Sequence, residues 1–579
     1  MKKITLFSLT MLFVFNVGRL NAQVNTNLPN NGLTHSMSPV EQFEMRNSGN
    51  NFRITSPPVG PVRNIAEYEP SEAVIIAYVG GFGIPGTVIK DLSNTGKVII
   101  IATSSDQSTV TSLLSSYGAN TANCSFLTAT VDSWWTRDYS GWFIADSSNK
   151  VQVVDFTYNR PRPNDDSLTK YEASLLGITY YGMNLVTTGG NYMCDGYNNA
   201  VSTVLVESDN STLDSTQIRL LASEYLGINN YMIRPDPLGQ YIKHIDCWGK
   251  FLAPDKILVD SVPAGDPQYS MYEAAAAYFK STNCPYGYKY KVYRPLIGGS
   301  STSSQTNPYS NTFIFNNRVF MPINGGYSAT HDTAAIQLYR KAMPGYIVKG
   351  YYADSTGSQA WLNSDALHCR THEIADRSML YIQHFPLYGI INSPTGYTIN
   401  AKVVSYAGTA IAANYPVAIY KVNNNGTWDS IPLSLVGYHS YSGVIPVQTN
   451  GDTVFYYIKA KDVNGKLAYH ALMGKADPHF FIVGGNVGIT ELNAHPEMSF
   501  FTFPNPSKGD FYVFLNSNYA DKASVMIYSI TGNLVFQDNF IVESGANKKL
   551  IHLNDLSQGV YMLEVRTNSN IITKRIMIQ

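Results

Sequence analysis

A cysteine, a histidine and two aspartates in three short segments could together act on a planar cation. Cys369 lies in SDALHCRTHE, His244 and Asp246 lie in YIKHIDCWGKF, and Asp138 lies in WWTRDYSGWF. An arginine side chain stays protonated under ordinary conditions, so a site that attacks it must accept it as a cation. Two carboxylates suit this task, because each accepts a forked pair of N–H donors. The sequence therefore predicts a site that holds a guanidinium between Asp138 and Asp246.

The thiol and the imidazole supply the remaining chemistry. As a thiolate, Cys369 would attack the central carbon, and the cation of the substrate would itself lower the pKa of the thiol. His244 would protonate the departing ammonia, leaving a covalent thiouronium on Cys369, and would then activate water. Side chains alternate along an extended segment, so His244 and Asp246 are expected on the same side. Asn311, in YSNTFIF, would supply an amide that orients the site.

Each of these residues also has a simpler interpretation. Asp138 beside Arg137 could form a surface ion pair, and His244 alone is typical of a hydrogen-bonded core histidine. A lone Cys369 is more often an inert buried thiol, and Asn311 before a strand is most often a turn residue. The chemical interpretation depends on the order and context of all the motifs together.

The elements that must position these residues change in type along the chain. From about residue 65, β-branched runs such as EAVIIAYV, KVQVVDFTY and, as the last of them, MLYIQHFPL alternate with helix-like stretches such as QSTVTSLLSSYG. This alternation predicts an α/β domain over residues 61–390. Helix signals then vanish, and residues 391–487 predict an immunoglobulin-like β-sandwich. Residues 488–579 predict another small β-sandwich.

The N-terminal residues indicate export. Lys2 and Lys3 precede a short apolar run and a small-residue cleavage site, so residues 1–22 are expected to be a signal peptide. Residues 23–60 are polar and lack periodicity, which is typical of a pro-segment or flexible arm. No other apolar run approaches the roughly 20 residues that cross a membrane. We therefore expect an exported product without a transmembrane segment, either secreted or attached to the outer surface.

Composition excludes some partners. The formal net charge is −1 and only 14% of residues are charged, which gives no reason to expect nucleic acid or an anionic membrane as partner.

Five cysteines in an exported chain leave at least one thiol unpaired, and their number is too small for a disulfide framework. A zinc site built from His244, Cys247, His368 and Cys369 is not expected, because the spacing is unlike that of zinc fingers.

Five segments in this order resemble the guanidino-group-modifying superfamily: WWTRDYSGWF, TTGGNYMCDG, YIKHIDCWGKF, YSNTFIFNNRVFMP and ALHCRTHE. Within it, the chain resembles secreted bacterial peptidylarginine deiminases of the agmatine-deiminase branch. The resemblance implies a five-bladed α/β propeller (pentein) and a catalytic set of Asp138, His244, Asn311 and Cys369, with Asp246 as second guanidinium-binding acid. It also implies a calcium-independent enzyme without cofactor, expected to be a monomer. The last 80 residues or so resemble the C-terminal sorting domain of type IX secretion, whose machinery would be a partner.

The stretch FTYNRPRPNDD bears on the substrate. Arg160 and Arg162 flank Pro161, so both guanidiniums could project to one side of an extended loop and bind a carboxylate. The alternative is a solvated basic turn neutralised by Asp165 and Asp166. In the enzymes that the chain resembles, this pair binds the α-carboxylate of a C-terminal arginine, whereas agmatine carries no carboxylate. By motif position, further substrate contacts are expected from Trp135, Gly190, Tyr241 and Ile242.

The leading hypothesis is thus an exported deiminase acting on peptides that end in arginine. A deiminase of free arginine or agmatine is the first alternative, and free arginine also has a carboxylate. A secreted cysteine protease using Cys369, His244 and Asn311 is the second, although papain-like enzymes have the order Cys, His, Asn. A non-enzymatic adhesin built on the β domains is the third, and it would tolerate replacement of Cys369.

Overall fold

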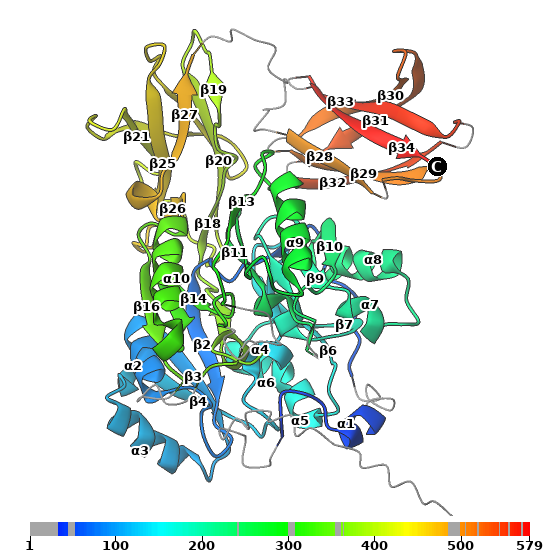
Figure 1. Cartoon of the computed structure of the whole chain (residues 1–579). Coiled ribbons are helices and arrows are strands. Elements are labelled where there is room, and N and C mark those ends of the chain that lie inside the picture. Colours follow the sequence, from blue (N-terminus) through cyan, green and yellow to red (C-terminus); the bar gives the residue numbers. More distant parts are fainter. Residues whose placement is uncertain are drawn as a thin grey trace, which may run out of the picture.

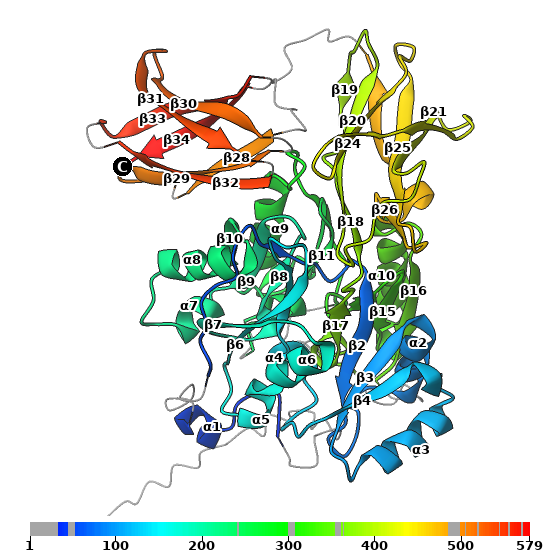
Figure 2. The ribbon, with the colours of Figure 1, turned by 180° about the vertical axis from the view of Figure 1, so that it is seen from behind.

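The computed structural model gives a mixed α/β part followed by two all-β units (Figures 1 and 2). The α/β part, the described residues from 33 to 375, contains the expected catalytic residues and is called the catalytic part below. Residues 1–22, which are expected to be a signal peptide, and Tyr241 lie outside the residues that it describes. The described residues are 33–44, 52–239, 242–298, 307–353, 360–362, 364–484, 498–503, 505–517, 520–543, 545–553, 556–568 and 571–579.

Within the described residues, the catalytic part contains five small sheets. Each contains an antiparallel pair and at least one parallel pair, and a helix precedes the last parallel strand, as parallel pairing requires a crossover. In order of hydrogen-bonded neighbours the sheets are β17 (His372–Ala375), β2 (Ser71–Ala77), β3 (Lys97–Ala102) and β4 (Cys124–Thr128); β1 (Arg63–Asn64), β5 (Trp142–Ala145), β6 (Val151–Tyr158) and β7 (Tyr180–Thr187); β10 (Asn230–Arg234), β9 (Asn199–Thr203) and β8 (Met193–Cys194); β11 (Gly249–Ala253), β12 (Lys256–Val259) and β13 (Lys291–Tyr293); and β14 (Phe313–Phe315), β15 (Arg318–Pro322) and β16 (Ile347–Tyr351).

The helices of the catalytic part fall into two groups. The crossover helices are α2 (Gly86–Thr95), α3 (Gln107–Tyr117), α6 (Leu168–Leu176), α8 (Ser215–Leu226), α9 (Tyr269–Ser281) and α10 (Ala329–Ala342). Helix α8 begins at a capping box between Asp214 and Gln217 and ends at Gly227, whose φ of 68° is left-handed. The short helices are α1 (Pro39–Glu44), α4 (Thr136–Tyr139), α5 (Pro163–Asp166), α7 (Leu205–Asp209) and the 3₁₀ turns η2 (Thr121–Asn123), η3 (Gly189–Asn191), η4 (Ile245–Cys247), η5 (Gly326–Ser328) and η6 (His368–Arg370).

One sheet joins the two ends of the catalytic part. Strand β17, which follows Cys369 by three residues, pairs antiparallel with β2, the second strand of the chain, in the register His372 to Ile75. Apolar residues of β2 and β3 are almost wholly buried on both faces, which explains why their sequence is a continuous β-branched run. Cys369 is therefore fixed at the edge of a sheet that the first strands have built.

The second unit has two sheets with one shared core, which includes Leu380, Ile399, Val403, Ile458 and Phe481. Its strands are β18 (Leu380–Gln383), β20 (Tyr397–Ser405), β24 (Ser440–Ile445) and β23 (Ser434–Gly437) in one sheet, and β19 (Ile390–Ile391), β27 (His479–Val483), β25 (Thr453–Lys461), β21 (Val417–Val422), β22 (Asp429–Pro432) and β26 (Leu467–His470) in the other. The 3₁₀ turn η7 (Gly474–Ala476) precedes β27.

Strand β18 corrects the expected domain boundary. We expected MLYIQHFPL to be the last strand of an α/β domain ending at residue 390, but β18 pairs with β20 in the second unit. A β-branched run predicts that a segment forms a strand, but it does not predict with which other strand that segment pairs. Pairing is decided by contacts with residues elsewhere in the sequence. In the structure, the second unit therefore begins no later than Leu380.

The third unit also consists of two sheets around a core, which includes Val513, Val525, Leu563 and Ile576. The strands are β28 (Met498–Phe503), β29 (Asp510–Ser517) and β32 (Gly545–His552) in one sheet, and β31 (Leu534–Val542), β30 (Asp521–Ser529), β33 (Gly559–Arg566) and β34 (Ile571–Ile578) in the other.

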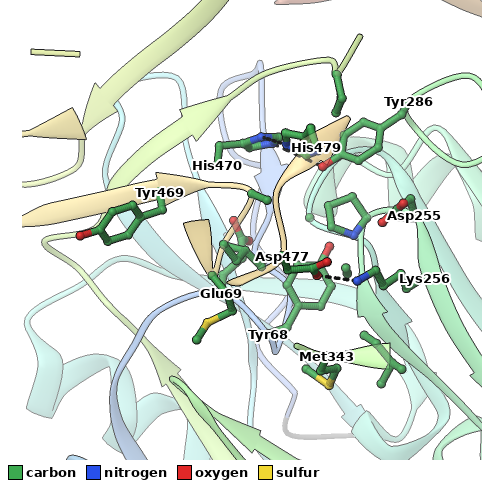
Figure 3. A pocket seen from close by; sticks show the side chains of 18 of the residues that line it. Tyr68, Glu69, Asp255, Lys256, Tyr286, Met343, Tyr469, His470, Asp477 and His479 are labelled. Atoms are coloured by element: carbon green, nitrogen blue, oxygen red, sulfur yellow. Dashed lines mark hydrogen bonds and ion pairs between the residues drawn. The ribbon is translucent and has the colours of Figure 1, made fainter. Parts of the chain in front are cut away.

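A cavity of about 430 Å³ lies where the second unit meets the catalytic part (Figure 3). Tyr68 and Tyr286 line it from the catalytic part, and His470 and His479 line it from the second unit. An ion pair crosses the same junction, in which Lys256 Nζ lies 2.5 Å from an oxygen of its partner, Asp477. None of the expected catalytic residues lines this cavity.

Two further observations concern the whole described chain. All five cysteines are free thiols, and only Cys124 is not fully buried. Within the described residues, no helix combines the length and the apolar character needed to cross a membrane.

Candidate active site

Cys369 lies in the 3₁₀ turn η6, and the residue has no exposed surface. Its Sγ lies 3.3 Å from Asn311 Nδ2 and 3.9 Å from Asp246 Oδ2. Burial, reinforced by the charges of Asp246, Asp365 and Asp138, raises the pKa of the Cys369 thiol well above its usual value. The resting group is therefore the neutral thiol, and it requires a nearby positive charge to become a nucleophile.

Asn311 holds the turn that carries the thiol. Its Oδ1 accepts hydrogen bonds from the backbone N–H of His368 at 3.0 Å and of Cys369 at 3.4 Å, while its Nδ2 faces the Cys369 sulfur. The side chain is completely buried. Asn311 thus contacts three groups of the η6 turn, so it does more than shape its own loop.

Asp138 lies in the one-turn helix α4 and is completely buried. Its Oδ2 lies 2.6 Å from His35 Nε2, and its Oδ1 lies 3.6 Å from His244 Nδ1. Burial raises the pKa of this carboxyl, but the neighbouring His244 and His35 outweigh burial and hold the pKa below its usual range. A surface ion pair with Arg137 is excluded, because Arg137 binds Glu373 at 2.7 Å in the interior.

His244 faces Asp138 and has no exposed surface. Neither ring nitrogen has a hydrogen-bond partner within the described part of the chain, so it is not a satisfied core histidine. Burial lowers the pKa of His244 to about 4, although Asp138 and Asp246 oppose this shift. The imidazole is therefore neutral near pH 7 and can accept a proton during a reaction.

The expected extended geometry of KHID is only partly correct. His244 has extended backbone angles, but Ile245 begins the 3₁₀ turn η4, which ends at Cys247. Strict alternation of side chains therefore does not apply, and the turn brings Asp246 to the thiol. Asp246 and His244 still influence each other's charge, as expected for side chains that share one site.

Behind Asp246 lies an ionic network that the sequence analysis missed. Asp246 Oδ2 lies 2.7 Å from His368 Nδ1, and His368 Nε2 lies 2.7 Å from Glu67 Oε2. The same Glu67 oxygen accepts a hydrogen bond from Lys250 at 2.7 Å. Burial raises the pKa of Asp246, but the hydrogen bond with His368, the charge of His368 and the charge of His244 together outweigh burial, so the pKa is lowered. His368 thus positions Asp246 and favours its charged form.

Gly190 lies close to the side chains of both Asp138 and His244. A Cβ atom at this position would lie 2.6 Å from Asp138 Oδ1 and 2.6 Å from His244 Nδ1. Its expected role as a substrate contact stays a prediction. What the geometry requires is that residue 190 has no side chain.

Replacing Gly190 by alanine is therefore expected to lower kcat by about 100-fold, because it displaces groups that must stay aligned to within about 1 Å. Steady-state rates and the thermal unfolding midpoint should be measured for Gly190→Ala and for Gly265→Ala, since a Cβ at Gly265 meets no atom within 4 Å. Full activity of Gly190→Ala would contradict the close approach.

Arg160 and Arg162 are buried, with 5% and 2% of their surface exposed. A solvated basic turn is therefore excluded, and neither side chain forms an ion pair with Asp165 or Asp166 within the described chain. Arg160 Nη1 donates to Asn159, whereas Arg162 Nε donates to Glu41 Oε1 at 2.9 Å. Arg160 Nε and Arg162 Nη1 have no partner among the described residues. Both guanidiniums thus have N–H groups available for an anion.

Trp135 is 1% exposed and is the N-cap residue of α4, which carries Asp138; its expected contact with substrate stays a prediction. Its Nε1 donates to Asp365 at 3.0 Å, Asp365 in turn pairs with Arg370, and the Arg162 guanidinium lies 5.2 Å from the indole centre. Ile242 is packed in the hydrophobic core of the catalytic part, so its expected contact with substrate also stays a prediction.

His35 is a further residue that the sequence analysis missed. It belongs to the segment expected to be a flexible arm, yet it lies among Asp138, His244 and Trp135. With Asp138 and His244, and again with Asp365 and Cys369, it forms groups whose possible ligand atoms lie within 4.8 Å of one another. These groups could hold a metal ion, but they are not the zinc set considered from the sequence. That the enzyme needs no cofactor stays a prediction.

Two family models match parts of this chain. Residues 85–374 match the model of a family described as the Porphyromonas-type peptidyl-arginine deiminases. Residues 502–579 match the model of a secretion-system C-terminal sorting domain, which indicates export by type IX secretion.

Individual relatives are more distant. A protein of Legionella pneumophila (strain Paris) named as an agmatine deiminase is 25% identical over 305 residues, which are 49% of this chain and 84% of the relative. The agmatine deiminase of Enterococcus faecalis has a solved structure with a TM-score of 0.46 and 18% identity, over 56% of this chain and 100% of the other. A structure from Porphyromonas gingivalis named as an arginine deiminase gives a TM-score of 0.46 and 19% identity, over 54% of this chain and 98% of the other.

Proposed function

The chain belongs to the Porphyromonas-type peptidyl-arginine deiminase family, and from this premise we propose that it converts arginine at the C-terminus of peptides to citrulline and ammonia. As a member of this family it is an enzyme that acts on a guanidino C–N bond.

The single observation that carries the proposal is the enclosed set of two carboxylates, a thiol and an imidazole. Asp138 and Asp246 are both buried and held in their charged form. Two buried negative charges without full compensation favour a cation between them. A guanidinium suits this position, because its planar N–H donors can serve both carboxylates.

The chemistry then follows in two halves. The substrate cation lowers the pKa of Cys369, whose sulfur forms a bond to the guanidinium carbon as one C–N bond breaks. The proton lost by the thiol leaves on ammonia, delivered by His244, and a thiouronium remains on Cys369. Water, deprotonated by His244, adds to the same carbon, the C–S bond breaks, and citrulline leaves. One proton is released to solvent and the neutral thiol is restored.

The buried arginine pair supports a substrate with a carboxylate. Arg162 lies beside Trp135, which is next to Asp138 in sequence, and the charge of Arg160 acts on Asp138 and His244. Two buried guanidiniums close to the guanidinium-binding acid suit a ligand with a cation at one end and an anion nearby. Agmatine lacks that anion, although several relatives are named agmatine deiminases. Free arginine has it and is the second candidate.

We expect a peptide that ends in arginine to gain about one dalton on incubation with the enzyme, because an NH group is exchanged for oxygen. The gain should occur without added calcium and should be absent with Cys369→Ala. Mass spectrometry of the peptide checks both points, with Cys284→Ala as a matched control because Cys284 is a buried thiol outside the site.

Other outcomes would replace the proposal. An unchanged peptide together with conversion of free arginine would identify the small molecule as substrate. A cleaved peptide would indicate a protease, and dependence on calcium would contradict the expected independence from metal.

We propose that the five sheets are the five blades of an α/β propeller, and that the second unit is an immunoglobulin-like sandwich. The product would be a monomer on the outer surface or released from it, after the signal peptide and sorting domain have been removed. Its partners would be arginine-containing peptides and the secretion machinery, not nucleic acid.

A further inference from the structure

Residues 33–44 of the N-terminal segment lie in the proposed substrate site. Helix α1 lies next to α5 in both views of the molecule (Figures 1 and 2). Two side chains of this polar segment are nearly excluded from solvent, His35 with 4% and Glu41 with 7% of their surface exposed. A loose arm would leave both in water, so their burial requires a specific reason.

His35 makes the contacts expected of a bound guanidinium. Its Nε2 lies 2.6 Å from Asp138 Oδ2, and its ring is stacked on Trp135 with 4.7 Å between centroids and 7° between planes. A ring nitrogen also lies within 4.8 Å of Cys369 Sγ, and one lies within the same distance of a His244 ring nitrogen. Like a guanidinium, imidazole is planar and able to donate hydrogen bonds to a carboxylate. The ring thus lies between the nucleophile, the proton carrier and one binding acid.

Glu41 makes the contact expected of the substrate carboxylate. Its Oε1 accepts a hydrogen bond from Arg162 Nε at 2.9 Å, and the backbone oxygen of Thr34 accepts one from Arg162 Nη2 at 2.6 Å. The carboxylate is oriented by Ser38 at the start of α1. Ser38 N–H donates to Glu41 Oε2 at 2.8 Å, and Glu41 N–H donates to Ser38 Oγ at 3.2 Å.

We propose that residues 33–44 are an intramolecular inhibitor, in which His35 occupies the place of the substrate guanidinium and Glu41 that of its α-carboxylate. The assignment of these two places rests on the proposed function, but the blockage of Cys369 does not. Because the two contacts are made to different parts of the site, a substrate must displace both to bind.

The tether makes the inhibitor effective. Farther along the segment, the backbone N–H of Thr55 donates to the oxygen of Gly182 in β7 at 3.0 Å, and Gly182 N–H donates to Thr55 Oγ1 at 3.1 Å. Residues 33–44 are therefore attached to the domain that they block. A segment tethered in this way competes at an effective concentration of about millimolar, so even modest affinity keeps the site occupied. Cleavage of the chain between Glu44 and Phe52 would make it a separate peptide that dilution removes.

The test uses point variants of the full chain with two independent measurements. His35→Ala and Glu41→Gln should each raise kcat/KM for a peptide ending in arginine by about tenfold or more, because the fraction of open enzyme increases. They should also accelerate alkylation of Cys369 by iodoacetamide, measured at one pH by mass spectrometry of the Cys369-containing fragment. Gln42→Ala and Glu44→Gln change exposed side chains of the same helix and should behave as wild type.

The two measurements separate the inhibitor from the activity. Faster alkylation with faster turnover supports both proposals. Faster alkylation without turnover of any guanidine by any variant supports the inhibitor and overturns the deiminase. Unchanged alkylation and turnover in both variants, with unfolding midpoints equal to that of the wild type, overturns the inhibitor and leaves the deiminase untouched. If the unfolding midpoint falls in only one of the two variants, the alkylation and turnover of the other variant decide whether residues 33–44 are an inhibitor.

Discussion

Replacing Asp138 by asparagine should reduce kcat/KM for a peptide ending in arginine by about 160- to 5,000-fold, since removing one partner of a buried ion pair costs about 3–5 kcal/mol. The substitution keeps the shape of the side chain and removes its charge. Asp138 is completely buried, and its Oδ1 has no hydrogen-bond partner within the described chain, so this oxygen is available to the substrate. Water cannot take over the role of a carboxylate in so enclosed a position.

The measurement is steady-state kinetics with a colorimetric or mass-based determination of citrulline. Asp429→Asn is the matched control, because it makes the same chemical change at an exposed position of the second unit. The variant chain also carries the inhibitory segment, whose His35 loses its acid as well. A double variant, His35→Ala with Asp138→Asn, should therefore be compared with His35→Ala alone. Retention of full activity in that comparison would show that Asp138 does not bind the guanidinium.

The second large effect concerns substrate choice. In Arg162→Ala, the ratio of kcat/KM for a peptide ending in arginine to that for the same peptide with an arginine amide should fall by about 10²-fold. Truncating one partner of a buried, hydrogen-bonded charge pair costs about 2–5 kcal/mol, and the amide has no charge to pair. Arg162 lies beside Trp135 and already binds a carboxylate, that of Glu41.

The ratio is the proper measure because Arg162 also holds the N-terminal segment. Loss of Arg162 should loosen residues 33–44 and raise both rates, but this release acts on both substrates alike and cancels in the ratio. Arg340→Ala, which alters an exposed arginine of α10, serves as the control. Equal rates on acid and amide in the wild type, or an unchanged ratio in the variant, would mean that Arg162 supports the loop and does not read the carboxylate.

Much of the framework could be predicted from the sequence because its signals are local. Continuous β-branched runs identified buried strands such as β2 and β3, and the helix-like stretch QSTVTSLLSSYG identified α3. The assignment of β18 to the wrong unit has the opposite cause. Its residues indicate a strand equally well in either place, and only its pairing with β20, which starts 14 residues after the end of β18, decides.

The functional residues divide in the same way. Asp138, His244, Asp246 and Cys369 stand in recognisable motifs, and the structure brings them together, while their roles await the experiments above. Glu67 and His368 were missed as a pair because 301 positions separate them, and no local sequence pattern indicates their contact. His35 stands in a segment without periodicity, although the capping pair Ser38 and Glu41 is a local sign of the helix that follows it.

The pairing of β17 with β2 has a consequence for the making of the protein. Strands β2 to β4 emerge early during synthesis, but their sheet is completed only by residues 372–375, immediately after the nucleophile. Asp138 and Asp246 are synthesised long before Cys369, the residue with which they share the site. A nascent or truncated chain that ends before residue 369 has neither the nucleophile nor the strand that fixes it. The proposed active site is therefore assembled as one of the last events in building the catalytic part. Chains that end before residue 369 cannot carry out the proposed reaction.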